Sequence, residues 1–167
     1  MSVRIVALTG RHDRRDFDCG DAALNEFLRR YARQQADRDF SRTYVAVAGE
    51  KPEILGFHAL STGAIAFQNW PSDLRLPRYP VPVARIGRLA VERRAQGTGV
   101  GAALLGHALR LSMATADQIG LHAVVVDAKH PRVAAFCSRY GFQPFQDGAL
   151  SMFLMMSVIR RIWREEL

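Results

Sequence analysis

An apolar run, a glycine-rich turn and a long helical segment follow one another between Val83 and Gly120. The run VARIGRLAV is typical of a β-strand, and the stretch QGTGVGAALLGHALRLSMATADQIG starts as a turn and continues as a helix. Gly97, Gly99 and Gly101 have no side chains, so backbone N–H groups of the turn can approach a ligand closely. The helix that follows adds the positive end of its dipole. This combination is suited to binding a pyrophosphate.

Other phosphate-binding turns fit this stretch less well. A Walker loop is excluded because no Gly-Lys-Ser/Thr follows the glycines. A dinucleotide-binding fold is disfavoured because the turn comes late in the chain and lacks the expected βαβ run with a distal acidic residue. Taken alone, the three glycines could also form a simple tight connection between a strand and a helix.

The remaining segments predict an α/β (α+β) fold. Strands are expected at residues 3–8, 42–49, 53–67, 83–91, 121–128 and 150–158. A first helix is expected to begin after Asp18 or Asp21 and to bury a face formed by Leu24, Phe27, Leu28 and Tyr31. A short helix is expected over 131–141, and the proline-rich stretch 68–82 is interpreted as an irregular loop that borders a site. This order predicts a single domain over residues 1–167, with a central mixed twisted sheet flanked by helices.

The charge of the chain favours an anionic partner. The net charge is +7, and of the 23 basic residues only Lys51 and Lys129 are lysines. Arginine suits phosphate groups and stacks on bases, so a nucleic acid is one interpretation, while a coding bias with a solubilising surface is the other. No apolar run is long enough to span a membrane, and neither Cys19 nor Cys137 has metal-ligand spacing around it. We therefore expect a cytoplasmic protein with reduced thiols and no metal.

Two motifs resemble the GNAT acetyltransferase superfamily. The pattern Gln96-x-x-Gly99-x-Gly101 resembles the superfamily signature that holds the pyrophosphate of acetyl-CoA, and AAFCSRYGF resembles its Phe-Tyr-x-x-x-Gly-Phe segment. Further stretches, including FDCGDAALNEFLRRYARQQ and GFHALSTGAI, are similar to the acetyltransferase toxins of bacterial toxin–antitoxin pairs. That resemblance implies acetylation of the α-amino group of aminoacyl-tRNA, silencing by a small ribbon-helix-helix antitoxin, and a homodimer.

The resemblance also implies roles for residues near the turn. Acetyl-CoA would be held by Leu89, Ala90, Val91, Gln96, Gly97, Thr98, Gly99, Val100, Gly101 and His130. The Val91 N–H would face the thioester oxygen, and a preorganised donor of this kind is often among the larger catalytic contributions. Many members of the superfamily carry a glutamate on the central strand as general base. This strand has no carboxylate before Glu92, which is interpreted as a solvated charge, so water is expected to take the proton of the amine.

Cys137 stands where the superfamily usually has a tyrosine that protonates the departing thiolate. The thiol is a candidate proton donor, because its ordinary pKa of about 8.5 matches a thiolate better than that of a phenol near 10. Three alternatives remain: Cys137 only packs in the core, Tyr140 replaces the missing phenol, or solvent supplies the proton. Tyr140 is expected on roughly the same helix face as Cys137, where core packing is the competing role.

The predicted acceptor surface is rich in arginine. Contacts with tRNA are expected from Arg29, Arg30, Arg33, Arg42, Arg75, Arg78, Arg88 and Arg93, with Arg38 and Arg94 nearby. Phe67, Trp70 and Tyr79 are candidates for stacking on unpaired bases. His58 is expected to have access to the acceptor side, whereas His12, His107 and His122 are expected at the surface or in packing. The alternatives are acetylation of a small amine or a protein N-terminus, or a non-enzymatic protein that binds acetyl-CoA and nucleic acid.

Overall fold

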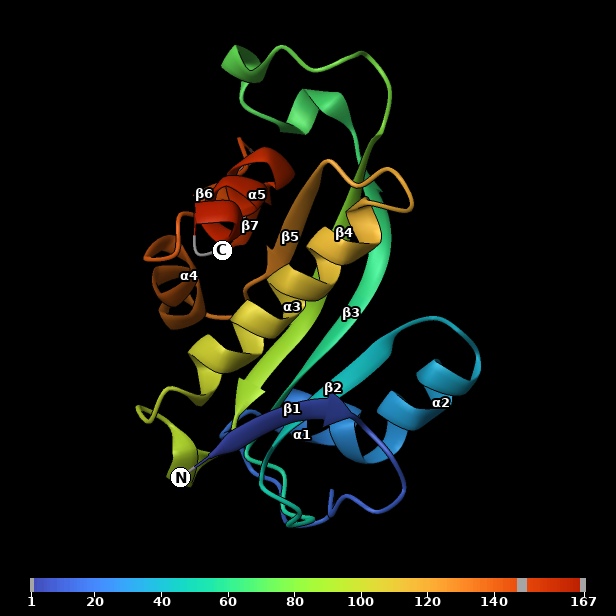
Figure 1. Cartoon of the computed structure of the whole chain (residues 1–167), viewed down its shortest axis with the longest axis vertical. Helices are drawn as coiled ribbons and strands as arrows, with labels where there is room; N and C mark the ends of the chain where they lie inside the picture. Colours follow the sequence, from blue (N-terminus) through green and yellow to red (C-terminus); the bar gives the residue numbers. More distant parts are fainter. Residues whose placement is uncertain (1, 147–149, 166–167) are drawn as a thin grey trace. The chain divides into compact units, whose positions relative to one another are not determined.

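The computed structural model describes residues 2–146 and 150–165, and the chain forms two units (Figure 1). Unit 1 comprises Met1–Ser61 and Gly87–Ala108, and unit 2 comprises Thr62–Ile86 and Leu109–Leu167. Strands β3 (Gly56–Ile65) and β4 (Val81–Val91) and helix α3 (Val100–Ala116) each run from one unit into the other. Each unit is described by itself below.

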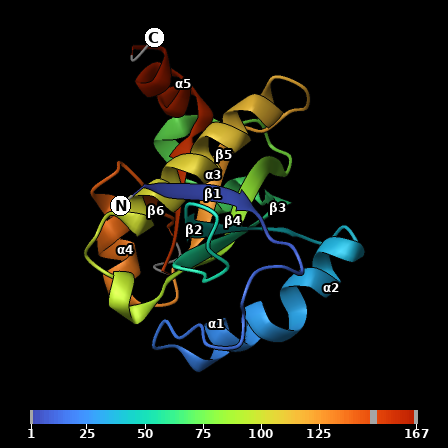
Figure 2. The same cartoon turned by 60° about the horizontal axis from the view of Figure 1, so that its bottom comes forward.

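In unit 1 the strands are hydrogen-bonded in the order β1-β2-β3-β4. Strand β1 covers Val3–Ala7 and β2 covers Arg42–Ala48; β1 pairs antiparallel with β2, and β2 with β3. Successive side chains of β2 face opposite sides of this sheet. Val45 accordingly packs with Phe27 of the first helix, while Ala46 packs with Leu104 of α3. The helices therefore cover both faces of the unit 1 sheet, as Figure 2 shows.

The first helix is interrupted. It consists of α1 (Ala22–Glu26), a π-helical turn over Phe27–Tyr31 and α2 (Ala32–Asp37). The Asp21 carboxylate caps its start by accepting hydrogen bonds from the N–H groups of Ala23 and Leu24 at 2.9 and 3.2 Å. The π-turn shifts the helical phase, so Ala32 is buried and Tyr31 is exposed. The predicted buried face is thus confirmed for Leu24, Phe27 and Leu28 and wrong for Tyr31.

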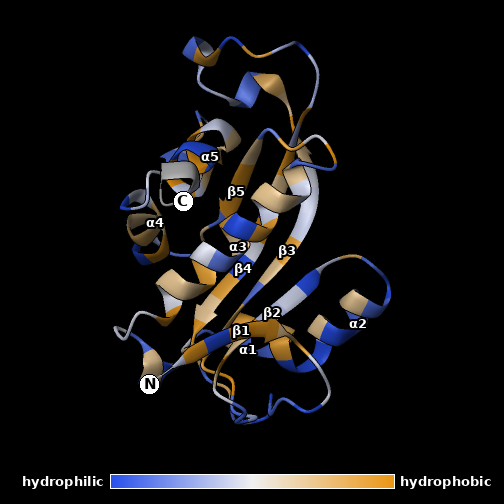
Figure 3. Ribbon diagram, in the orientation of Figure 1, coloured by the Kyte–Doolittle hydropathy of each residue, from blue (hydrophilic) through white to orange (hydrophobic). Residues whose placement is uncertain are grey.

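In unit 2 the strand order is β3-β4-β5-β7-β6. Strand β5 (Ala123–Asp127) is parallel to β4 and antiparallel to β7 (Ser151–Met155), which also pairs with β6 (Gln143–Pro144). Residues 123–126 are all buried, and Figure 3 shows the apolar colouring of β5. Helix α4 covers Pro131–Ser138 and α5 covers Met156–Glu165. The last predicted strand therefore ends earlier than expected, and the final two residues of the chain lie outside the described part.

The proline-rich stretch is less irregular than predicted. It contains short 3₁₀ turns at Phe67–Asn69 and Ser72–Leu74. Trp70 between them is buried, and its ring meets those of Phe153 and Phe145 edge-on at 4.8 and 5.0 Å. These contacts fix the loop on the unit 2 sheet. Among the helices of the described residues, none has the length and apolar character needed to cross a bilayer.

Candidate active site

The predicted turn lies at the end of β4 and the start of α3, within unit 1. After Val91 the chain forms a 3₁₀ turn over Arg93–Ala95 and then passes through Gly97 and Gly99, whose φ angles are +78° and +93°. Only glycine adopts this left-handed conformation without strain. A Cβ atom at Gly97 or Gly99 would have no atom within 4 Å, so the backbone of the turn faces open space. The geometry therefore fits the close approach of a phosphate group to the first N–H groups of α3.

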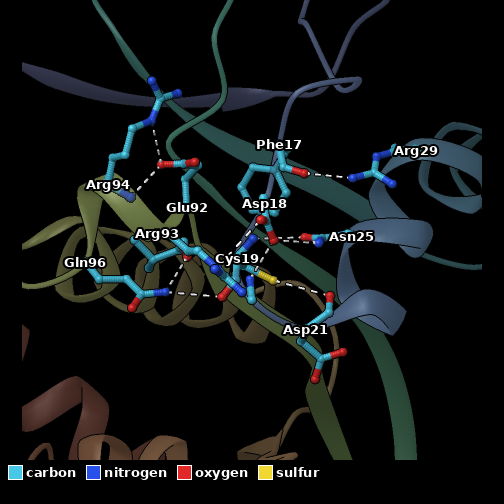
Figure 4. A network of polar contacts seen from close by, with 12 residues as sticks. Phe17, Asp18, Cys19, Asp21, Asn25, Arg29, Glu92, Arg93, Arg94 and Gln96 are labelled. Carbon is cyan, nitrogen blue, oxygen red and sulfur yellow. Dashed lines mark hydrogen bonds and ion pairs between the residues drawn. The ribbon is translucent and has the colours of Figure 1, made fainter.

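Gln96, the first residue of the motif, is exposed, but its side-chain amide binds the backbone of the protein itself. Its Nε2 donates hydrogen bonds to the carbonyl oxygens of Val91 at 3.0 Å and Cys19 at 3.2 Å (Figure 4). The N–H of Glu92, on the other side of the same peptide as the Val91 carbonyl, donates to the carbonyl of Leu55 at 2.8 Å. The Val91–Glu92 peptide is thus held at both ends, immediately after the residue whose N–H is the predicted oxyanion donor.

The other predicted cofactor residues at the end of β4 and in the turn differ in how deeply they are buried. Ala90 is buried, whereas Leu89 and Val91 are half-buried and pack with Ala95 and Val100. The hydroxyl of Thr98 donates to the Ala95 carbonyl and tightens the turn. These contacts attach the strand end and the start of the turn to the core of unit 1.

Glu92 is not the solvated charge that the sequence suggested. It is 7% exposed, and its Oε2 accepts hydrogen bonds from the backbone N–H of Arg94 at 2.7 Å and from Arg94 Nε at 3.4 Å. The prediction is wrong because Glu92 caps the 3₁₀ turn that follows it. A carboxylate engaged in this way is poorly suited to removing a proton from an acceptor.

In unit 2, Cys137 lies in the last turn of α4 and its side chain is fully buried. Burial raises the pKa of the Cys137 thiol to about 11. The thiol therefore stays protonated at neutral pH, which disfavours a thiolate nucleophile.

Tyr140 follows α4 and is 42% exposed, with its ring 5.1 Å from that of Phe136. Tyr140 and Cys137 do not share a helix face as expected, because α4 ends at Ser138 and Tyr140 lies beyond it. The predicted core role of Tyr140 is wrong, since its side chain is in contact with solvent. His130, also assigned to the cofactor, is exposed at the start of α4, and its carbonyl accepts from the N–H groups of Val133 and Ala134.

His58 is buried, so the predicted access to the acceptor side is wrong. Its Nε2 lies 2.9 Å from Nδ1 of His107, and the ring of Tyr44 lies 5.2 Å from the ring of His58 and 4.8 Å from that of His107. Because side chains alternate along β3, His58 faces α3, whereas Phe57 faces the first helix. The histidine pair belongs to the core of unit 1.

The eight arginines predicted to contact tRNA divide between the units. Unit 1 contains Arg29, Arg30, Arg33, Arg42, Arg88 and Arg93, and unit 2 contains Arg75 and Arg78. Several are oriented by local contacts: Arg29 Nη2 donates to the Phe17 carbonyl at 3.0 Å, and the Arg88 guanidinium lies 3.9 Å from the centre of the Phe27 ring. All but the half-buried Arg88 are exposed. Among the predicted stacking residues Tyr79 is exposed and Phe67 is partly exposed, but Trp70 is buried and so cannot stack on a base.

One polar cluster was missed by the sequence reasoning. Arg85 Nη1 on β4 lies 3.1 and 3.0 Å from the two carboxylate oxygens of Asp127 on β5, and the Ser151 hydroxyl donates to the same carboxylate at 3.2 Å. The central strand itself carries no carboxylate before Glu92. Asp127 comes from the neighbouring parallel strand, and the charged end of the otherwise apolar run AVVVD was the available signal.

The sequence profile of the Acetyltransferase (GNAT) family matches residues 11–142. The chain belongs to the GNAT acetyltransferase family. A protein named "Probable toxin TacT" from Sinorhizobium fredii is 32% identical to it, over 91% of this chain and 90% of that protein. A "tRNA-acetylating toxin" from Mycobacterium tuberculosis is 34% identical, over 87% of each chain.

Solved structures of similar GNAT proteins have the same fold. A mutant of KacT superposes with a TM-score of 0.91 at 27% identity, covering 97% of this chain and 99% of that one. AtaT complexed with acetyl-methionyl-tRNAfMet superposes with a TM-score of 0.88 at 26% identity, with the same coverage. A mutant AtaT toxin bound to the C-terminus of the antitoxin AtaR and acetyl-CoA has a TM-score of 0.83 at 26% identity, covering 98% and 99%. The predicted GNAT fold, with a mixed sheet and flanking helices, is thereby confirmed.

Proposed function

We propose that this chain is an acetyl-CoA-dependent toxin that acetylates the α-amino group of aminoacyl-tRNA and so blocks translation. The observation that carries the proposal is the open, left-handed glycine turn at the start of α3, in the strand–turn–helix setting of a GNAT pyrophosphate site. The choice of acceptor is supported by the similarity to the tRNA-acetylating toxin and to AtaT, whose structure contains an acetylated aminoacyl-tRNA.

In the proposed reaction the acceptor amine attacks the thioester carbonyl carbon, an N–C bond forms and the C–S bond breaks. The backbone of residues 96–101 binds the pyrophosphate, and Leu89, Ala90 and Val91 bind the pantetheine arm. The Val91 N–H donates to the oxygen on which negative charge develops. Because Glu92 is engaged in capping, solvent removes the proton from the amine, whose pKa is lowered by the ester bond of the aminoacyl group.

The departing thiolate needs a proton. The Cys137 side chain is fully buried and its pKa is raised to about 11, so the thiol does not face a ligand at the surface. Tyr140 is accessible to solvent and carries a phenol. Burial therefore favours Tyr140 over Cys137 as the proton donor, and we assign Cys137 a packing role.

Three further assignments follow from similarity to the toxins. Exposed arginines bind the tRNA backbone, and the protein acts in the cytoplasm, where charged tRNA is found. A small antitoxin of the ribbon-helix-helix class keeps the enzyme silent, as the complex of AtaT with the C-terminus of AtaR suggests by analogy. The active form is a homodimer, which sedimentation of the purified chain would test.

The decisive experiment is transfer of radiolabelled acetyl groups to total charged tRNA. Label should appear on charged tRNA but not on deacylated tRNA, and nuclease digestion should release N-acetyl-aminoacyl-adenosine. The rate should fall steeply between about 50 and 200 mM salt, because each phosphate contact releases counterions. Label on polyamines or peptides but not on tRNA would contradict the proposed acceptor, and no transfer at all would favour a binding protein.

A further inference from the structure

The segment that leads into the first helix is tied to the glycine turn within unit 1. The N–H of Arg93 donates to the Asp18 carbonyl at 2.9 Å, and Arg93 Nε lies 3.6 Å from the Asp18 carboxylate. Gln96 Nε2 adds the hydrogen bond to the Cys19 carbonyl at 3.2 Å. Gly20 has a φ of +93°, which favours glycine, and a Cβ at this position would lie only 3.3 Å from Arg93 Nε. Figure 4 shows these contacts side by side.

The same segment is attached to the first helix by a second set of contacts. The buried Asn25 accepts from the Cys19 N–H at 2.9 Å and donates to the Asp18 carboxylate at 3.0 Å. Arg29 Nη2 donates to the Phe17 carbonyl at 3.0 Å. A continuous chain of hydrogen bonds therefore leads from Gln96 through Cys19 and Asn25 to the helix that carries the predicted acceptor-binding arginines.

Gln96 occupies the junction of this chain. Both of its partners are carbonyl oxygens, which accept only, so the amide nitrogen and not the amide oxygen must face them. One bond fixes the carbonyl of Val91, next to the proposed oxyanion donor, and the other holds the 17–21 segment. A side chain used in this way has its donor group committed to the protein and away from a phosphate.

We propose that Gln96 is a positioning residue that holds the Val91 peptide and couples occupancy of the glycine turn to the first helix. A ligand that orders the turn also orders the 17–31 segment, and by linkage an acceptor bound by that helix favours the ordered turn. This inference rests on the proposed function in taking acetyl-CoA as the ligand of the turn and an acceptor as the ligand of the helix.

Hydrogen exchange of the full chain, with and without CoA as an unreactive probe, tests the coupling. In the natural chain CoA should slow exchange in residues 93–104 and also in residues 17–31. In Gln96→Glu, which keeps the shape of the side chain but replaces the donor by an acceptor, protection of 93–104 should remain. Protection of 17–31 should be weakened, because only the Arg93–Asp18 contacts still join the two segments. Equal protection of 17–31 in both proteins, or none in the natural chain, would overturn the coupling. If CoA failed to protect 93–104 in the natural chain, the proposed acetyl-CoA site itself would be wrong.

Kinetics test the positioning role independently. Gln96→Glu should lower kcat about tenfold while the dissociation constant for acetyl-CoA changes by less than about threefold. Gln96→Arg should restore most of kcat, because a guanidinium can donate to both carbonyls. Gln118→Glu makes the same charge change at an exposed position after α3 and should match the natural chain. Weaker acetyl-CoA binding with an unchanged kcat would instead mean that Gln96 contacts the ligand, and would overturn the proposal. The melting temperature of each variant confirms that it is folded.

Discussion

Arg85 and Asp127 form an ion pair across the parallel strands β4 and β5, with Arg85 Nη1 3.0 Å from the Asp127 carboxylate. Their side chains are 33% and 19% exposed, so both charges are partly removed from water. Removing one partner leaves the other half-buried and unpaired, which costs more than losing a surface pair. The pair lies on the face of the sheet that also carries Val83 and Val125, whose side chains are buried.

We predict that Asp127→Asn lowers the free energy of unfolding by about 1–2 kcal/mol, as measured by urea denaturation. Replacing both partners, with Arg85→Met and Asp127→Asn together, should cost less than the sum of Arg85→Met alone and Asp127→Asn alone. Glu50→Ala, which removes the partner of Arg4 at the surface, is the control and should cost less than about 0.5 kcal/mol. Additive single and double changes would show that the Arg85–Asp127 pair has no coupling energy.

The buried His58, paired with the half-buried His107, should make the protein sensitive to acid. Burial, and secondly the neighbouring charge of His107, lowers the pKa of His58 to about 3. Because the unfolded chain binds a proton near pH 6.5 and the folded chain does not, this contribution is fully present above pH 6.5. It is lost as the pH falls from about 6.5 to about 3, at roughly 1.4 kcal/mol for each pH unit.

Thermal unfolding between pH 7 and pH 4.5 measures this effect. The melting temperature of the natural chain should fall over this range, and that of His58→Phe, which keeps a ring beside Tyr44, should fall less steeply. His122→Phe is a suitable control because His122 is exposed and lies outside the pair. Equal slopes for all three proteins would mean that His58 does not set the acid sensitivity.

Gly56 is required by packing. A Cβ at this position would lie 2.8 Å from the Ala90 carbonyl oxygen and 2.8 Å from Leu104 Cδ1. Gly56→Ala should therefore destabilise the chain by about 2 kcal/mol or more, because the backbone oxygen cannot move aside. Gly120→Ala, where a Cβ meets nothing within 4 Å, should be close to neutral. Comparable urea midpoints for the two variants would contradict the close contact at Gly56.

The buried thiol of Cys137 should be dispensable for turnover. Cys137→Ala and Cys137→Ser should keep kcat within about threefold of the natural value while lowering the melting temperature, because a packed group is removed or made more polar. Cys137→Tyr introduces the family's phenol into a fully buried position and should destabilise the chain by overpacking. If folded Cys137→Ala lost more than about tenfold in kcat, the Cys137 thiol would be the proton donor and the packing role would be wrong.

The phenol of Tyr140 should matter for chemistry and not for stability. Tyr140→Phe should lower kcat by at least about tenfold and leave the melting temperature nearly unchanged, since the hydroxyl lies on an exposed side chain. Single-turnover acetyl transfer separates the chemical step from product release. An unchanged single-turnover rate would leave solvent as the source of the proton.

The parts of the fold that depend on local rules were predictable. The strand–turn–helix around Gly97 and Gly99 follows from glycine's freedom at positive φ, and the start of the first helix follows from the capping carboxylate of Asp21. The near-continuous apolar run before Asp127 predicted β5, because a strand buried on both faces needs apolar side chains at successive positions.

The missed features depend on contacts between distant residues. Trp70 is buried because Phe145 and Phe153 lie beside it, about eighty positions later in the chain. Gln96 donates a hydrogen bond to the carbonyl of Cys19, which is 77 positions earlier in the sequence, and no sequence pattern near either residue predicts that bond. The π-turn at Phe27–Tyr31 shifts the helical phase, so that Ala32 is buried and Tyr31 exposed, and the periodicity of the sequence does not reveal such a shift.

The contrast between the two cysteines gives the native chain a built-in labelling position. Both thiols are free, but Cys137 is fully enclosed, whereas Cys19 is half-buried beside the carbonyl that binds Gln96. Partial burial also raises the pKa of the Cys19 thiol, so alkylation should be slow at neutral pH and faster in mild base. A maleimide dye attached there would report by fluorescence on the junction between the glycine turn and the first helix, without any engineered cysteine.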